Sequence, residues 1–137
     1  MGAGWPATRR SGETLMEAVM QFIRLCHADD IAEGHSRGFD PLEEGRDSVM
    51  VVRHGGRLHA WRDACPHHGG TPMAWWKDHY LNAASTRIVC ASHGAQFDIE
   101  TGECTLGPCM GQRLQKVELF ITGEREVCIR PDGEEMA

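Results

Sequence analysis

The chain has 137 residues and a mass of 15.2 kDa, a size typical of one domain with short tails. Its content of hydrophobic residues, 41%, is ordinary for a globular protein and argues against disorder along the whole length. The 20 Asp and Glu residues outnumber the 14 Lys and Arg residues, and the net charge of −6 argues against binding to the phosphate backbone of nucleic acids.

Most of the chain is expected to form a single folded domain, over residues 20–131. Residues 1–19 carry scattered glycine and proline without apolar periodicity and are interpreted as a flexible leader, and residues 132–137 as a solvated tail. Arg9-Arg10 could begin an export signal, but charged residues interrupt the apolar segment that such a signal needs. No apolar run approaches the roughly 18–20 residues of a membrane-spanning helix. The sequence therefore predicts a soluble, cytoplasmic protein that binds neither membrane nor nucleic acid.

The first predicted elements are a strand over residues 22–25 and a single helical turn over residues 28–31. A hairpin follows, with strands over residues 48–54 and 57–61. Gly55-Gly56 between these strands supplies the positive φ angles of a two-residue turn, which makes this the strongest hairpin signal in the chain.

Two further strand pairs are predicted in the second half of the chain. Residues 87–91 pair with residues 96–99, and residues 116–122 pair with residues 126–130 across a turn at Gly123. Many short strands separated by turns indicate an all-β fold, which we expect to be a small antiparallel β-sandwich or barrel.

Two short motifs each combine a cysteine with a histidine. Cys65-Pro66-His67 has one residue between the two side chains, Cys90-Ala91-Ser92-His93 has two, and 22 residues (68–89) separate the motifs. Each motif is followed by glycine, at Gly69-Gly70 and at Gly94. Glycine there lets the backbone approach a bound group closely and direct N–H groups toward it. Iron–sulfur clusters need such donors, because hydrogen bonds to sulfur stabilise the more negative reduced state.

This pair of motifs resembles the signature of the Rieske family, in which C-x-H and C-x-x-H lie on glycine-containing loops between short strands. The resemblance covers residues 21–131. It implies a Rieske-type fold with a cluster-binding subdomain, and a [2Fe-2S] cluster in which two histidines replace two cysteines on one iron. Carried over by position, Cys65 and Cys90 bind one iron, and His67 and His93 bind the other.

The resemblance continues beyond the second motif. Phe97-Asp98-Ile99 and Thr101-Gly102 resemble the F-D-x-x-T-G continuation of the family, and Gly107-Pro108 resembles the proline-bearing loop that covers the cluster. The residues expected beside the cluster, without binding iron, are His68, Gly94, Ala95, Phe97 and Pro108.

The kind of Rieske centre is indicated by four positions. Respiratory members of the family have an extra cysteine in each cluster loop, and the matching residues here are Gly70 and Ser92, so that disulfide cannot form. The serine and tyrosine whose hydroxyls donate to the cluster and ligand sulfurs are replaced by Ala95 and Phe97. With fewer donors the reduced cluster is less stabilised. The resemblance is therefore to the low-potential ferredoxins of oxygenase systems.

The sequence favours an electron carrier over an enzyme. No histidine follows His93, so the mononuclear iron triad of a Rieske oxygenase is not expected, and no G-x-G-x-x-G motif follows a predicted strand. We expect a soluble ferredoxin that takes single electrons from a flavin-dependent reductase and passes them to a terminal oxygenase or a related enzyme. The alternative is an accessory or regulatory [2Fe-2S] subunit of a permanent enzyme complex. More distant alternatives are a zinc-binding module with the same four ligands, although zinc fingers usually pair cysteine with cysteine, and a purely structural role for these side chains.

The four other cysteines are interpreted in two groups. Cys26 and Cys128 lie in apolar strand patterns and are expected to be small buried packing residues. Cys104 and Cys109 flank the Gly107-Pro108 loop, so they are either reduced packing residues, a disulfide, or neighbours of the cluster edge.

Aromatic residues are concentrated between the two motifs. Residues 73–80 contain Trp75, Trp76 and Tyr80. Either this segment packs its aromatic rings on the sheet, or it presents an exposed apolar docking surface near the cluster.

Overall fold

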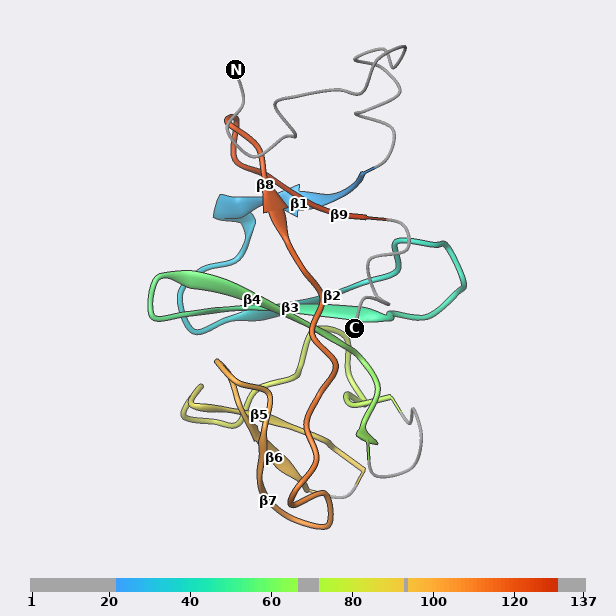
Figure 1. Ribbon diagram of the computed structural model, residues 1–137, viewed down its shortest axis with the longest axis vertical. Helices are drawn as coiled ribbons and strands as arrows, with labels where there is room; N and C mark the ends of the chain where they lie inside the picture. Colours follow the sequence, from blue (N-terminus) through green and yellow to red (C-terminus); the bar gives the residue numbers. More distant parts are fainter. Residues whose placement is uncertain (1–21, 67–71, 93, 131–137) are drawn as a thin grey trace.

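The computed structural model of the protein describes residues 22–66, 72–92 and 94–130, which form nine short β-strands and one 3-10 turn. The strands make three antiparallel sheets of three strands each, stacked along the long axis of the molecule (Figure 1). The predicted all-β fold class is therefore confirmed. No helix in these described ranges is long and apolar enough to cross a membrane. The predicted leader at residues 1–19 and tail at residues 132–137 lie outside the described residues.

The first sheet joins the two ends of the described chain. β1 (Ile23–His27) pairs with β9 (Glu126–Ile129), and β9 also pairs with β8 (Phe120–Ile121). A 3-10 turn at Ala28–Asp30 follows β1 directly, so the predicted helical turn is confirmed. The strands predicted over residues 22–25 and 126–130 are confirmed as β1 and β9. The two cysteines of this sheet are buried and have free thiols, as predicted for packing residues: Cys26 and Cys128.

The second sheet lies in the middle of the molecule and contains the predicted hairpin. β3 (Val49–His54) and β4 (Arg57–Arg62) pair on either side of Gly55 and Gly56, whose φ angles are +64° and +79°. These are the positive angles that a two-residue hairpin turn requires. β2 (Ser36–Phe39) adds a third strand beside β3. β2 was not predicted, because its four residues show no alternation of apolar and polar side chains.

The third sheet lies at the opposite end of the molecule from the first (Figure 1). It contains the predicted strands β5 (Arg87–Val89) and β6 (Gln96–Asp98), together with β7 (Cys104–Leu106), which was not predicted. One cysteine–histidine motif follows β4, and the other connects β5 to β6. The cysteines of both motifs, Cys65 and Cys90, therefore lie in the core at this end of the molecule.

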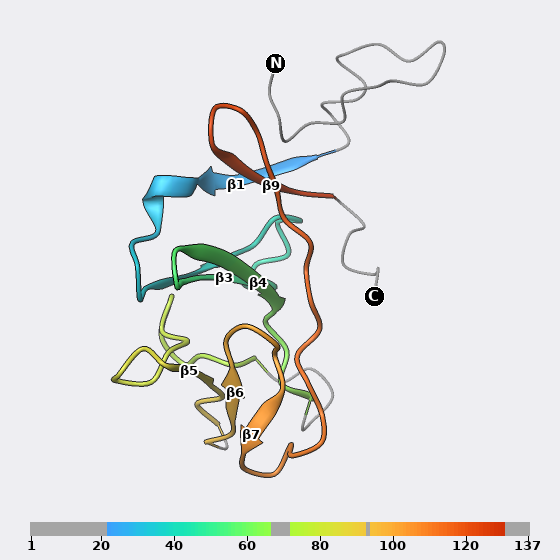
Figure 2. The ribbon, with the colours of Figure 1, turned by 60° about the vertical axis from the view of Figure 1, so that its left-hand side comes forward.

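A long connection returns the chain from the third sheet to the first. Residues 107–119 run up the side of the molecule from β7 to β8 (Figure 2). On the way the amide of Val117 donates to the carbonyl oxygen of Ala60 in β4 at 3.1 Å. The strand predicted over residues 116–122 is therefore confirmed only where it coincides with β8, because the residues before it follow the second sheet through isolated bonds.

Strand β3 contributes to two separate hydrophobic cores. Val49 and Val51 belong to the core between the first and second sheets, whereas Met50 and Val52 belong to the core between the second and third. Successive side chains of a strand point to opposite faces, so a strand covered on both faces is continuously apolar. We call the first the scaffold core. The second, the site core, contains Met50, Val52, Trp61, Cys65, Met73, Tyr80, Ile88, Cys90, Ala95, Phe97, Ile99, Cys104, Cys109 and Leu114.

Candidate metal centre

Two of the four predicted ligands lie in the site core. Cys65 comes shortly after β4 and Cys90 directly after β5, and both side chains are 0% exposed. Because the two residues share one buried cluster, the fold brings the two motifs together. The other two predicted ligands, His67 and His93, and the predicted neighbour His68 lie outside the described residues.

A buried carboxylate closes the first ligand loop. Asp63, two residues before Cys65, accepts a hydrogen bond from the amide of Met73 at 2.8 Å and another from the hydroxyl of Tyr80 at 2.7 Å. Burial raises the pKa of Asp63, while the two hydrogen bonds favour its carboxylate form. Burial and the bond to Asp63 raise the pKa of Tyr80, which stays a neutral donor. The two ends of the loop are therefore held together without any metal.

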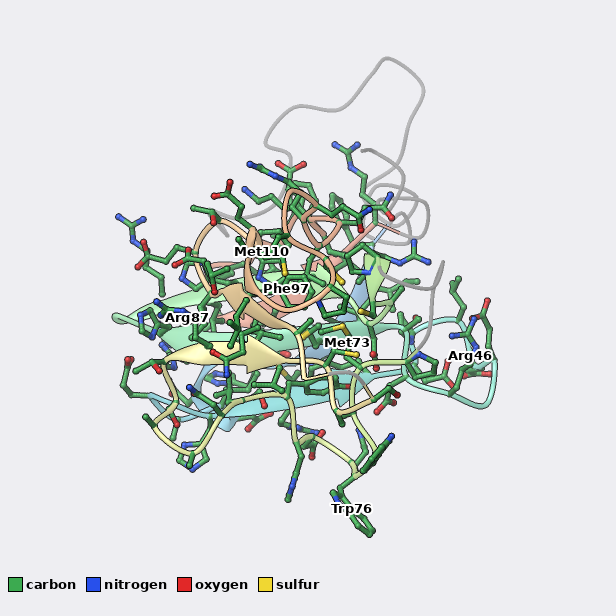
Figure 3. The ribbon with its side chains drawn as sticks, turned by 90° about the horizontal axis from the view of Figure 1, so that it is seen from below. Arg46, Met73, Trp76, Arg87, Phe97 and Met110 are labelled. Carbon is green, nitrogen blue, oxygen red and sulfur yellow. The ribbon has the colours of Figure 1, made fainter. Side chains whose placement is uncertain are left out.

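Backbone hydrogen bonds close the second ligand loop and attach it to the first. The amide of Cys90 donates to the carbonyl oxygen of Ala95 at 2.8 Å. The amide of Gly94 donates to the carbonyl oxygen of Cys90 at 2.7 Å, and Gly94 has a φ of +73°. The amide of Ala91 donates to the carbonyl oxygen of Met73 at 2.8 Å. Met73 thus bonds to both loops, and it lies near the middle of the view onto this end of the molecule (Figure 3).

The proline-bearing loop packs directly on the second ligand loop. Gly107 has a φ of +105°, and a Cβ built on it would lie 2.8 Å from the Cα of Ala95, so only glycine fits there. Pro108 itself is exposed, as is Gly94. Ala95 and Phe97 are both 0% exposed and lie inside the site core. Of these predicted neighbours, Ala95 and Phe97 are therefore buried, and Gly94 and Pro108 are at the surface.

Cys104 and Cys109 are reduced in the structure and lie in the site core, where Cys109 contacts the predicted ligand Cys65. The Sγ of Cys109 is 3.7 Å from the Sγ of Cys65, and burial raises the pKa of the Cys109 thiol. The thiol of Cys104 donates to the carbonyl oxygen of Leu106 at 3.3 Å. Both cysteines are free, so the interpretation as reduced residues holds, and Cys109 also adjoins the site.

The aromatic segment between the motifs is partly packed and partly exposed. Two of its side chains bind the backbone of β2: the carboxylate of Asp78 accepts from the amide of Gly38 at 2.7 Å, and the ammonium of Lys77 donates to the carbonyl oxygen of Gly38 at 2.6 Å. Its tyrosine is buried, whereas Trp75 and Trp76 are each 68% exposed. Trp76 projects away from the body of the molecule (Figure 3). Tyr80 therefore packs in the core, as the first interpretation predicts, and the docking of a partner on the exposed tryptophans stays a prediction.

The chemistry of the described donors fits an iron–sulfur cluster. Cys65 and Cys90 place two thiols in an apolar core, where a thiolate is unfavourable unless a cation compensates its charge. Within the part of the chain that the structure describes, no three His, Cys, Asp or Glu side chains form a metal-binding group, and the histidine half of the predicted set lies outside that part. The thiols would hold one iron, and His67 and His93 would hold the other.

Asp63 was not singled out as part of the site in the sequence, and Cys109 was given only as one of two possible neighbours of the cluster edge. Their contacts join residues 10, 17 and 44 positions apart, so no local spacing reveals them. The only signals were an acidic residue at the end of an apolar strand, and a cysteine directly after Gly107-Pro108.

A family model described as the Rieske [2Fe-2S] domain matches residues 21–121. The chain belongs to the Rieske family. Its cofactor is accordingly a Rieske-type [2Fe-2S] cluster, as the two motifs predicted.

Individual relatives of this Rieske protein come from two kinds of system. The ferredoxin component of the alkene monooxygenase system of Xanthobacter autotrophicus is 29% identical over 84 residues, which are 61% of this chain and 62% of that protein. Human (Homo sapiens) apoptosis-inducing factor 3 is 33% identical over 101 residues, which are 74% of this chain but 15% of that protein. The chain thus spans less than two thirds of either relative. A solved structure, the ferredoxin of carbazole 1,9a-dioxygenase from Nocardioides aromaticivorans IC177, superposes with a TM-score of 0.60 at 27% identity, covering 81% of this chain and 98% of that one.

Proposed function

We propose that this protein is a Rieske ferredoxin that carries single electrons from a flavin-dependent reductase to a terminal oxygenase or a related enzyme, and that it does so in the cytoplasm. The observation that carries the proposal is the pair of buried thiols, Cys65 and Cys90, on two loops that are hydrogen-bonded to each other. Together with His67 and His93 they form the proposed ligand set. The ferredoxins of the alkene monooxygenase and carbazole dioxygenase systems support the oxygenase as acceptor.

The chain's own residues prepare the site. When bound, the cluster supplies a one-electron redox couple. Asp63 and Met73 hold the two ligand loops in one arrangement through bonds that need no metal. Ala95 and Phe97 fill the core beside the loops and keep water away from the thiols. A site that is fixed before the metal binds also stays fixed when its charge changes.

Net charge suggests how such a carrier meets its partners. The charge of −6 favours association with a basic surface on a reductase or an oxygenase. Interactions of this kind steer the encounter and weaken as salt is added, since the Debye length falls from about 30 Å at 0.01 M to about 10 Å at 0.1 M. The rate of electron transfer to a partner should therefore fall with ionic strength.

The proposal is tested in two stages with purified protein. Iron and acid-labile sulfide are assayed first, together with the EPR spectrum of the reduced protein, which should be rhombic with a lower average g than that of clusters bound only by cysteine. A flavin-dependent reductase of an oxygenase system is then used to reduce the protein. Oxidation of the reduced protein by a terminal oxygenase is followed by stopped-flow absorbance. One zinc per chain without sulfide contradicts the cluster, and a reduced cluster that no oxygenase oxidises contradicts the carrier role.

A second candidate function is a fixed [2Fe-2S] module of a larger assembly. The similarity to apoptosis-inducing factor 3 favours it, because the matching segment is only 15% of that protein. Size-exclusion chromatography of the protein from its native cells distinguishes the two. A carrier elutes alone at its own mass, whereas a module stays in a complex at high salt.

A further inference from the structure

One buried side chain of the site core is outside the proposed ligand set but contacts it. Cys109 is 1% exposed, and its Sγ lies 3.7 Å from the Sγ of the proposed ligand Cys65. It comes two residues after Gly107, whose close approach to Ala95 holds this loop against the second ligand loop. The position of the thiol is therefore set by the packing of the loop.

Only one of the two sulfurs carries a proton when iron is bound. A cysteine bound to metal is a thiolate and can only accept a hydrogen bond. Cys109 is outside the proposed ligand set, and an S–H group is a weak hydrogen-bond donor. The nearby thiol of Cys104 already donates to the carbonyl oxygen of Leu106 at 3.3 Å. The charged sulfur of Cys65 is then the strongest acceptor within reach of the Cys109 proton.

We propose that Cys109 donates an S–H hydrogen bond to the thiolate of Cys65 and thereby makes the cluster easier to reduce. The inference rests on the proposed assignment of Cys65 as a ligand. An added electron increases the negative charge on the ligand sulfurs, so the hydrogen bond is stronger in the reduced state. Since S–H is a weak donor, we expect a change of about threefold to tenfold in the ratio of reduced to oxidised protein. This corresponds to about 30–60 mV for one electron.

The test compares holoproteins of known iron and sulfide content by protein-film voltammetry. Cys109→Ala, or Cys109→Val if the smaller side chain prevents folding, should keep the cluster and lower its potential by the amount given. Cys109→Ser supplies a hydroxyl donor and should restore at least part of the loss. Cys26→Ala is the control, because it removes a buried thiol of the scaffold core, and its potential should equal that of the wild type.

A vibrational measurement separates the hydrogen bond from packing. Transfer to D2O should shift an iron–cysteine stretching band in the resonance Raman spectrum of the wild type by more than in Cys109→Ala, which lacks the exchangeable thiol proton. An unchanged potential with an unchanged isotope shift overturns the inference. A Cys104–Cys109 disulfide found by mass spectrometry also overturns it, since a disulfide has no proton to donate. An unaltered cluster in Cys65→Ser would show instead that the ligand assignment of the proposed function is wrong.

Discussion

The thiols of Cys65 and Cys90 lie on two loops that are hydrogen-bonded through residues outside the proposed ligand set. Asp63 bonds to the far end of the first loop, and the carbonyl oxygen of Met73 accepts from the residue after Cys90. Because these bonds join both loops to one residue, a displacement of either loop affects the other. The ligand geometry is therefore a property of the whole cluster-binding end rather than of two separate motifs.

Removing any proposed ligand should abolish or badly damage the cluster, because each loss leaves one iron short of a donor. Visible absorption and iron content of the purified protein measure the effect. As controls, Cys26→Ser and Cys128→Ser alter buried cysteines of the first sheet and should keep the cluster. A normal visible spectrum of His93→Ala would mean that another residue binds the iron assigned to His93. The four variants are Cys65→Ser, His67→Ala, Cys90→Ser and His93→Ala.

Hydroxyl donors introduced beside the cluster should raise its potential. Ala95 and Phe97 are fully buried in the site core and offer no hydroxyl. In Ala95→Ser and Phe97→Tyr the new hydrogen bond favours the more electron-rich reduced state, by about 60–130 mV at most for each donor. Protein-film voltammetry measures the shift. A wild-type potential above about +100 mV, near the middle of the range of Rieske centres, or no rise in either variant, would contradict this account.

The burial of Cys65 and Cys90 in one core is consistent with the two motifs in the sequence, but the contacts that hold their loops could not be predicted from it. Cys65 and Cys90 belong to motifs of three and four residues, whose spacing and following glycines are local properties. Asp63, Tyr80 and Cys109 act across distances of up to 44 positions, which only the packing of the three sheets brings together. Nothing in a local pattern distinguishes such an aspartate from one on the surface.

Among the elements, strands with a distinct turn signal were predicted correctly. The Gly55-Gly56 turn determines the pairing of β3 and β4, and the structure has the positive φ angles that the turn requires. β2 and β7 have no such signal: each is at most four residues long, and each pairs with a strand that already has a partner. Their positions depend on tertiary packing, which overrides weak local preferences.

The β3–β4 turn should make stability depend on pH. The carboxylate of Glu33 accepts hydrogen bonds from the amides of Gly55 and Gly56 at 2.7 and 3.0 Å, which lower its pKa below the usual value of 4.5. The bonds stabilise the fold fully above that value, and the contribution is lost as the pH falls through the folded pKa. Glu33→Gln should therefore lower the urea midpoint at pH 7, and the difference should shrink at lower pH. Glu118→Gln, an exposed control, should show no such trend; a difference that persists in acid would contradict the prediction.

A side chain at position 107 should destabilise the loop after β7. In Gly107→Ala the new Cβ meets the backbone of Ala95 at 2.8 Å, and the φ of +105° is strained as well. We expect a loss of about 1–3 kcal/mol in unfolding free energy and faster bleaching of the cluster by an iron chelator. Gly111→Ala is the matched control, since its φ of +91° imposes the same strain but no atom lies within 4 Å of the new Cβ. Equal bleaching rates in the two variants would show that the close approach does not matter.

At the scale of the whole molecule, the two cores should respond differently to removal of the metal. The site core contains the proposed thiol ligands, whereas the scaffold core contains none. In apoprotein the amides of β5, β6 and β7 should exchange about tenfold faster or more than in holoprotein, while those of β1 and β9 should change little. Hydrogen–deuterium exchange with mass spectrometry measures both. A uniform acceleration in all three sheets would show that the molecule opens as one unit.

The pairing of β1 with β9 has a consequence for how this fold can be used in larger proteins. Ile23 lies directly opposite Ile129, so the described chain enters and leaves the domain at one place. That place is in the first sheet, at the end of the molecule opposite the third sheet (Figure 1). Domains whose ends lie close together tolerate insertion into other chains. The Rieske domain can accordingly be inserted into, or fused with, a longer polypeptide that leaves the end with the third sheet accessible to a partner.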